Sequence, residues 1–294
     1  MMNRRSMLKS AALAGAALAA GTQSVTFAED IPAEPIYSGG TPWADLLGWK
    51  VGCQAYSFNR YTFEEALQKN ASIGLRYIQM FPGQKLSKEH ADVAIGPGMT
   101  KEQRYWLKSL LAEYHTVPLS IGVIGADRGT FEFAADLGLP NIASEPAFDR
   151  LKDVDKLAQE YGVNVALHNH PKPSIYWDYH IVLEHIKDLS DRVGACADTG
   201  HYIRSGINPL EAVKALKGKI KEFHFKDLHE NSRGGHDVIW GTGVCDVPAI
   251  LAELKEQNFK GPFFAEYEYN WESSVPEIAA GMKFFNETAK ELAK

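Results

Sequence analysis

Four short apolar runs, each ending in polar residues, decide the fold of this chain: Val165-Ala-Leu-His168-Asn-His170, Ala195-Cys-Ala-Asp198-Thr-Gly-His201, Glu222-Phe-His224-Phe-Lys226-Asp227 and Phe263-Phe-Ala-Glu266-Tyr-Glu268. An amphipathic helical stretch follows each run. Alternating strands and helices of this kind build a parallel barrel, and the chemistry of such barrels lies at the carboxyl ends of the strands. The four runs therefore predict a rim that carries His, Asp and Glu side chains.

Eight strand–helix units fit into residues 50–294, which predicts an α/β fold of the (β/α)8 TIM barrel class in a single domain. A doubly wound sheet would also alternate strands and helices, but eight units in this length favour a closed barrel. The strand interiors are apolar, as a packed barrel core requires. The expected strands are Lys50–Ser57, Tyr77–Phe81, Pro118–Ile124, Ile142–Glu145, Asn164–His168, Gly194–Asp198, Ile220–Phe225 and Gly261–Tyr267. The expected helices are Thr62–Ile73, Lys101–His115, Phe131–Leu137, Asp149–Tyr161, Ile175–Leu189, Pro209–Leu216, Val247–Gln257 and Val275–Ala293.

Residues 1–30 are expected to lie outside the barrel as a signal peptide and leader. Paired arginines in the segment 3–9 (NRRSMLK) precede a short apolar stretch of small residues, which is the pattern of a twin-arginine (Tat) export signal. The apolar stretch is too short to span a membrane. The sequence thus predicts a periplasmic or otherwise exported protein with no stable membrane insertion after signal cleavage. Residues 31–49 are interpreted as an N-terminal extension of the barrel.

The net charge bears on the class of partner. It is −6 for the whole chain, and removing Arg4, Arg5 and Lys9 with the signal changes it to −9. A domain this acidic argues against nucleic acid as the main partner. We therefore expect a small-molecule substrate, and a homo-oligomer is left open.

The polar strand ends predict one divalent metal ion. Residues i and i+2 of a strand share a face, so His168 and His170 are co-facial. Imidazole and carboxylate ligands together suit Mn²⁺ or Zn²⁺ best, with Co²⁺, Fe²⁺ and Mg²⁺ as alternatives. Each residue has an ordinary explanation when taken alone: Asp198 could cap a turn, and Glu266 could pair with a lysine. Four such residues on consecutive strand ends favour a shared ion.

Three of the motifs resemble signatures of the sugar phosphate isomerase/epimerase superfamily of xylose-isomerase-like barrels: Asp198-Thr-Gly-His201, His224-Phe-Lys226-Asp227 and Glu266-Tyr-Glu268. The resemblance extends from about Lys50 to the C-terminus. It implies a substrate with a carbonyl beside a hydroxyl, polarised by the metal so that a proton on the adjacent carbon can be removed. It also implies which residues hold the ion: His168, Asp198, His224 and Glu266.

One departure from the family pattern bears on the reaction. The family's epimerases carry a metal-binding glutamate on the fifth strand that is also one of two acid/base groups, and here His168 stands in that place. Glu145, at the end of the preceding strand, could supply a carboxylate as base or as an alternative ligand. Losing one of two symmetric bases favours a lyase or dehydratase reaction over an isomerase or epimerase reaction.

Further roles follow from the same rim. Besides Glu145 and Glu266, the expected catalytic residues are Lys226 and His201. Lys226 could bind substrate oxygen or move a proton, or it could form a salt bridge to Asp227 or Glu266. His201 could orient substrate hydroxyls or support Asp198. The expected substrate contacts are Gln54, Tyr56, His170 and Trp271, with Gln79, Phe81 and Trp240 as further sugar-contact candidates.

The predicted export favours an unphosphorylated sugar or keto-sugar as the substrate, because sugar phosphates are mainly cytoplasmic. Two alternatives belong to other classes. One is a metal-dependent endonuclease like the related barrel of DNA repair, which acidity and export argue against. The other is a non-catalytic sugar-binding barrel.

Overall fold

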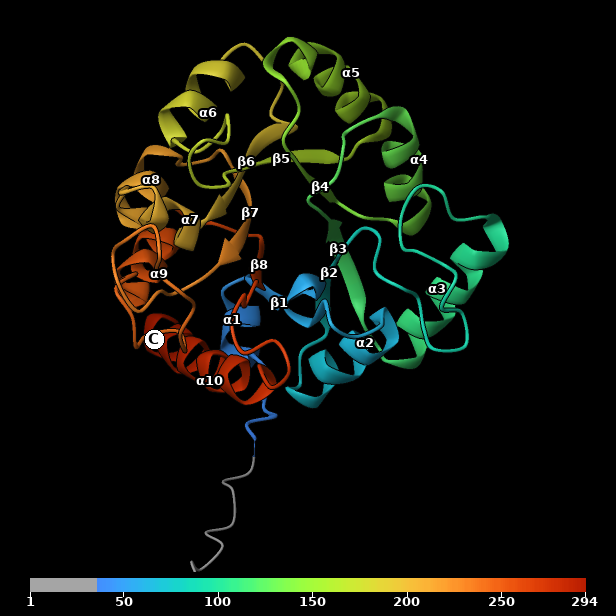
Figure 1. Cartoon of the computed structure of the whole chain (residues 1–294). Helices are drawn as coiled ribbons and strands as arrows, with labels where there is room; N and C mark the ends of the chain where they lie inside the picture. The colour runs from blue at the N-terminus through green and yellow to red at the C-terminus, as the bar shows by residue number, and fades with distance from the viewer. Residues whose placement is uncertain (1–35) are drawn as a thin grey trace, which may run out of the picture. The chain divides into compact units, whose positions relative to one another are not determined.

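A closed barrel of eight parallel strands with helices around it forms the part of the chain that the computed structural model describes, residues 36–294 (Figure 1). Each strand pairs with the next in chain order, and the first pairs with the last to close the barrel. The predicted TIM barrel is therefore confirmed. The strands are β1 (Lys50–Gln54), β2 (Tyr77–Met80), β3 (Val117–Ile121), β4 (Asn141–Ser144), β5 (Asn164–His168), β6 (Val193–Asp198), β7 (Ile220–Phe225) and β8 (Pro262–Ala265).

The helices follow the predicted alternation with a few differences. Two short helices, α1 (Pro42–Leu46) and α7 (Thr199–Arg204), were not expected. The first expected strand ends early, because the Gln54 side chain accepts a hydrogen bond from the Tyr56 amide and caps a 3₁₀ turn. The expected helix Ile175–Leu189 starts late, at Tyr179, where Asp178 caps it. The helical elements are α1 (Pro42–Leu46), η1 (Ala55–Phe58), α2 (Phe63–Ser72), α3 (Lys101–Glu113), α4 (Arg128–Leu137), η2 (Phe148–Arg150), α5 (Leu151–Tyr161), α6 (Tyr179–Ile186), α7 (Thr199–Arg204), α8 (Pro209–Ala215), α9 (Val247–Glu256) and α10 (Val275–Leu292).

An aromatic cluster joins the barrel wall to α10. Phe263 on β8 is fully buried, and its ring centre lies 5.1 Å from that of Phe285 and 4.9 Å from that of Phe223. Trp49 packs at 5.5 Å on the same ring. Buried aromatic pairs add stability beyond their buried area. Phe263 is therefore central to the packing between strand and helix.

The predicted N-terminal extension is partly described. Its helix α1 packs beside α10 (Figure 1), and the Trp43 amide donates a 3.0 Å hydrogen bond to the Asn286 side chain. The predicted signal peptide and its paired arginines lie outside the described residues and stay predictions. Among residues 36–294, no helix has the length and apolar character needed to cross a bilayer.

The barrel interior is polar along β7, which corrects the expected apolar interior. Side chains of a strand alternate between two faces. Phe223 and Phe225 pack against aromatic rings in the layer outside the barrel, whereas Glu222 and His224 bond to the side chain of Gln79 on β2. Amide and hydroxyl donors around Glu222 make this burial tolerable, since a buried carboxylate needs hydrogen bonds.

Candidate metal centre

Four side chains from consecutive strands converge at the carboxyl end of the barrel. Potential ligand atoms of His168, Asp198, His224 and Glu266 all lie within 4.8 Å of one another, and all four residues are buried. The parallel strands β5 to β8 end at the same rim, so successive strand ends bring these residues together. The structure thus assembles the predicted ligand set in one place, and the role of each residue as a ligand stays a prediction.

Asp198 connects the cluster to the next helix. Its Oδ1 accepts a 2.7 Å hydrogen bond from the His201 amide and so caps α7. Its Oδ2 lies 2.9 Å from Lys226 Nζ and 3.6 Å from His168 Nε2. Burial would raise the pKa of this carboxyl, but the positive charge of Lys226 and the contact with His168 hold it well below its usual range. The predicted cap and the predicted ligand are therefore compatible, because they use different oxygens.

His168 presents one ring nitrogen to the cluster. Its Nδ1 is 2.9 Å from Glu145 Oε1, while its buried Nε2 has no hydrogen-bond partner among the described residues. Burial would lower its pKa, but the carboxylates of Asp198 and Glu145 raise it to about 9. A carboxylate on one nitrogen with the other nitrogen free is the arrangement in which histidine commonly binds a metal. These carboxylates favour a cation at Nε2, either a proton or an ion.

Two of the distances between ligand atoms are close to those around a single ion, and a third, from His224 Nδ1 to Asp198 Oδ2, is longer at 4.0 Å. Ligands at ~2.0–2.2 Å from one metal lie roughly 3.0–3.5 Å from each other. His224 Nδ1 is 3.0 Å from Glu266 Oε2, and His168 Nε2 is 3.6 Å from Asp198 Oδ2. Two nitrogens and two carboxylate oxygens at these distances suit Zn²⁺ or Mn²⁺. The unpartnered His168 nitrogen and this spacing are the observations that support a metal here.

Lys226 is fully buried among three carboxylates. Its Nζ lies near Asp198 and Glu266 and 3.1 Å from Glu268 Oε2. Burial would lower its pKa, but these negative charges hold it well above its usual range. The lysine is therefore a stable cation and a poor base. The salt bridge to Glu266 is present, whereas Asp227 instead accepts backbone hydrogen bonds from Gly241 and Gly243.

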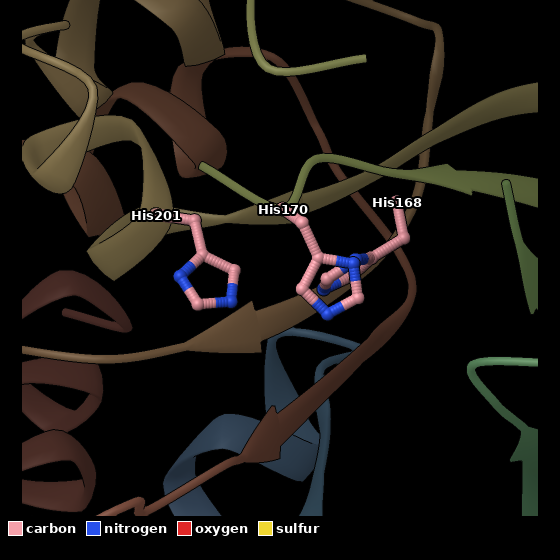
Figure 2. A group of neighbouring side chains, drawn as sticks. All are labelled: His168, His170 and His201. Atoms are coloured by element: carbon pink, nitrogen blue, oxygen red, sulfur yellow. The ribbon is translucent and has the colours of Figure 1, made fainter. Parts of the chain in front are cut away.

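Glu145 lies beside the four clustered residues, as expected, but its carboxylate oxygens already bond to neighbouring side chains. It accepts hydrogen bonds from His168, His170 and Ser174. Burial would raise its pKa, but the two histidines hold it well below the usual range. This carboxylate is thus a weak base that orients two imidazoles. Figure 2 shows His168 and His170 close together with His201 beside them, and the rings of His168 and His170 are 4.3 Å apart.

His201 lies at the start of α7 and faces the same space. Its Nε2 is 3.5 Å from Asp198 Oδ2, and its Nδ1 is 3.0 Å from an Arg204 nitrogen. Burial lowers its pKa well below the usual range, so the ring is neutral. Arg204 in turn pairs with Glu268 at 2.9 Å. The structure contains the expected contact between His201 and Asp198. The other expected role, orienting substrate hydroxyls, stays a prediction.

Some of the expected substrate contacts are partly exposed aromatic rings, and others are buried side chains. The half-buried ring of Tyr56 packs edge-on against Phe81 at 4.8 Å and Trp271 at 5.5 Å. Burial raises the pKa of Tyr56, and the negative charges of Glu268 and Glu266 raise it further. Gln54 is buried, and both ends of its amide bond to backbone groups. Two further sugar-contact candidates are also turned away from solvent: Gln79 lies inside the barrel and Trp240 lies in the aromatic core.

A family model described as a xylose isomerase-like TIM barrel matches residues 135–288, more than half of the chain. The chain belongs to this family. It is 29% identical over 148 residues to a protein named inosose dehydratase from Bacillus cereus, an alignment that covers 43% of this chain and 49% of that protein. The chain thus spans about half the length of the curated relatives it matches.

Two solved structures extend the likeness to most of the barrel. An uncharacterised protein from Parabacteroides distasonis is 30% identical, with a TM-score of 0.67 over 82% of this chain and 99% of that chain. A xylose isomerase-like barrel from Mycobacterium smegmatis, solved in complex with magnesium, has a TM-score of 0.69 over 85% of this chain and 99% of that chain. It is 12% identical, which shows a shared fold.

The sequence reasoning missed a polar layer inside this xylose isomerase-like barrel. Glu222 is fully buried, and its two carboxylate oxygens accept hydrogen bonds from Gln79, Ser120 and Asn141. Burial raises its pKa to about 7, even though these hydrogen bonds act in the opposite direction. The alternation of polar and apolar residues in β7 was the available signal.

We expect Glu222→Gln to weaken the pH dependence of stability. The pKa is about 7 in the folded protein against a usual 4.5, so the folded state binds extra protons between these values and stability falls as the pH rises through that window. The fall amounts to about 3 kcal/mol at most. Urea unfolding of metal-free wild type and variant at about pH 5 and about pH 8 measures it. Parallel pH profiles of the two proteins would contradict the expectation.

Proposed function

We propose that the protein is a metal-dependent lyase of the dehydratase type that acts on an unphosphorylated keto-sugar or related cyclic polyhydroxy ketone. The four converging ligand atoms carry the proposal. The partial relative named inosose dehydratase supports the elimination reaction. The predicted export signal favours an unphosphorylated substrate. His168, Asp198, His224 and Glu266 would hold the ion, and Mn²⁺ or Zn²⁺ fits this ligand set best.

A bound divalent ion would supply Lewis-acid polarisation of the substrate carbonyl. The chain itself must then supply a base near the mouth of the barrel. His170 fits this role, because its side chain is 49% exposed and its Nδ1 is bonded to Glu145. That contact leaves Nε2 free and fixes the direction of the ring. Lys226 is a stable cation, and Glu145 is occupied, so neither competes for the proton.

The elimination needs one proton-transfer group. His170 Nε2 takes the proton from the carbon beside the carbonyl. The electrons of that C–H bond form a double bond to the next carbon along, as the bond between that second carbon and its hydroxyl breaks. The same imidazole returns the proton to the departing oxygen, which leaves as water. An epimerase would need a second base on the opposite face. In this chain His168 stands at the fifth-strand position where the family's epimerases carry the carboxylate that serves as this second base.

The reaction class is tested by incubating the metal-loaded protein with free sugars, 3-keto-glycosides and inososes in deuterated buffer. We expect loss of water from a keto substrate, with no turnover after the metal is removed by a chelator. Clean interconversion of two epimers without an elimination product would establish the epimerase alternative. A full complement of bound ion without turnover of any compound would favour a binding barrel.

His170→Gln should lower kcat by about 10²–10⁴-fold, because general acid–base groups contribute on this scale. Its metal content should match wild type, since His170 is not one of the four proposed ligands. The matched control is His180→Gln, whose side chain is 70% exposed and paired with Asp178 away from the cluster. Elimination kinetics and metal analysis of both variants give the comparison. Turnover by His170→Gln at the wild-type rate would show that His170 is not the base.

A further inference from the structure

A chain of buried hydrogen bonds runs from the barrel interior to the metal centre. The amide nitrogen of Gln79 donates to Glu222 Oε1 at 2.7 Å and to Ser120 Oγ at 3.1 Å. The amide oxygen of the same residue lies 2.6 Å from His224 Nε2. All four residues are fully buried, so no solvent competes for these contacts. Gln79 therefore connects a carboxylate that the proposed reaction does not use to one of the four proposed ligands.

The partners of Gln79 allow only one orientation of its amide. Ser120 donates its hydroxyl proton to Glu222 Oε1, so its oxygen is available to accept from Gln79. The two amide protons of Gln79 thus have two acceptors. In the reversed orientation the amide oxygen would face the Glu222 carboxylate, acceptor against acceptor. One amide proton could then donate to His224 Nε2, but the other would be buried without a partner at about 1–3 kcal/mol.

This orientation determines which nitrogen of His224 carries the proton. The Gln79 oxygen has no proton to give, so His224 Nε2 must donate to it. The Nδ1 lone pair is then directed at Glu266 Oε2, 3.0 Å away, and toward Asp198 Oδ2 at 4.0 Å. A lone pair facing two carboxylate oxygens is suited to a cation placed among them.

We propose that Glu222 and Gln79 are positioning residues that hold His224 in the tautomer competent to bind the metal through Nδ1. Glu222 fixes the Gln79 amide, and Gln79 fixes the imidazole. Neither residue contacts the ion or the substrate. This inference rests on the proposed metal-dependent function, and it adds a determinant of metal affinity that lies one layer below the ligands in the barrel.

The test is the affinity of metal-free protein for Mn²⁺ or Zn²⁺ alone. Gln79→Met and Glu222→Met should raise the Kd by about 10–100-fold, the usual effect of removing a group that orients a ligand. Because both act through one hydrogen-bond chain, the double variant should bind about as weakly as the weaker single variant. Glu222→Gln keeps an oxygen acceptor for Gln79 and should bind close to wild type. The buried core variant Phe285→Leu controls for general loss of stability.

Nitrogen-15 NMR of His224 provides a readout that a structural role would not change. We expect a proton on Nε2 in zinc-loaded wild type, protected from exchange, and faster exchange of that proton in Gln79→Met. Wild-type affinity in both methionine variants, or additive effects in the double variant, would overturn the proposal. If wild type binds neither ion, the proposed function fails, and the hydrogen bond is judged separately in the metal-free protein. There an unprotonated Nε2 on a neutral His224 overturns the inference, and a protected Nε2 proton supports it.

Discussion

Asp198→Asn is expected to abolish tight metal binding and to lower elimination activity by roughly three orders of magnitude. The substitution removes the negative charge of Oδ2, the atom nearest to both Lys226 Nζ and His168 Nε2 in this carboxylate. Lewis-acid stabilisation is worth several kcal/mol, and each 1.36 kcal/mol is about tenfold in rate. An asparagine oxygen can still accept from the His201 amide, so α7 keeps its cap and the fold should be retained.

Metal analysis by mass spectrometry, together with turnover of the substrate found in the panel, measures both effects. The matched control is Asp178→Asn, which alters the same residue type at the start of α6, away from the metal centre. The control should retain its metal and its activity. If Asp198→Asn binds as much metal as wild type, Asp198 is not a ligand.

Phe263→Ala should lower the free energy of unfolding by about 3–5 kcal/mol, the range for removing a buried aromatic ring. The ring lies against Phe223, Phe285 and Trp49, so its loss leaves a cavity between β8 and α10 with rigid walls. Such a site collapses poorly, which places the expected effect toward the upper part of the range.

Urea unfolding followed by circular dichroism measures this loss, with wild type and variant both metal-free so that ion binding does not alter the comparison. Tyr105→Ala serves as the control, because that ring is 69% exposed on α3. Its effect should be about 1 kcal/mol or less. Equal losses in the two variants would contradict the central place of Phe263 in the core.

The ends of β5, β6 and β7 were the most predictable part of the molecule, and the other expected strands run past the ends that the structure has. Asn164–His168 and Ile220–Phe225 were predicted with the bounds that the structure has, because an apolar run followed by polar residues is a strong local signal. The convergence of His168 with Asp198 then follows from topology, since neighbouring parallel strands end at one rim. Such predictions need only the chain order of the elements.

Contacts between side chains could not be predicted in the same way. Helix α7 was missed because Asp198 caps it and also faces the cluster, and a sequence pattern does not separate these uses. The contact of Glu145 with both His168 and His170 depends on rotamers across two strands. The inward Glu222 was overlooked because a barrel interior is expected to be apolar, although the alternation along β7 indicated otherwise.

The polar layer inside the barrel also limits how the protein can be thermostabilised by engineering. Replacing Glu222, Gln79 and Ser120 together by apolar residues of matching volume removes buried polar groups whose desolvation is costly. The same redesign would leave His224 Nε2 without an acceptor. A design procedure that favours apolar interiors would therefore remove the residues that orient this histidine. Stabilising changes are better placed in the outer helices and loops, where they leave the hydrogen bonds from Glu222 through Gln79 to His224 intact.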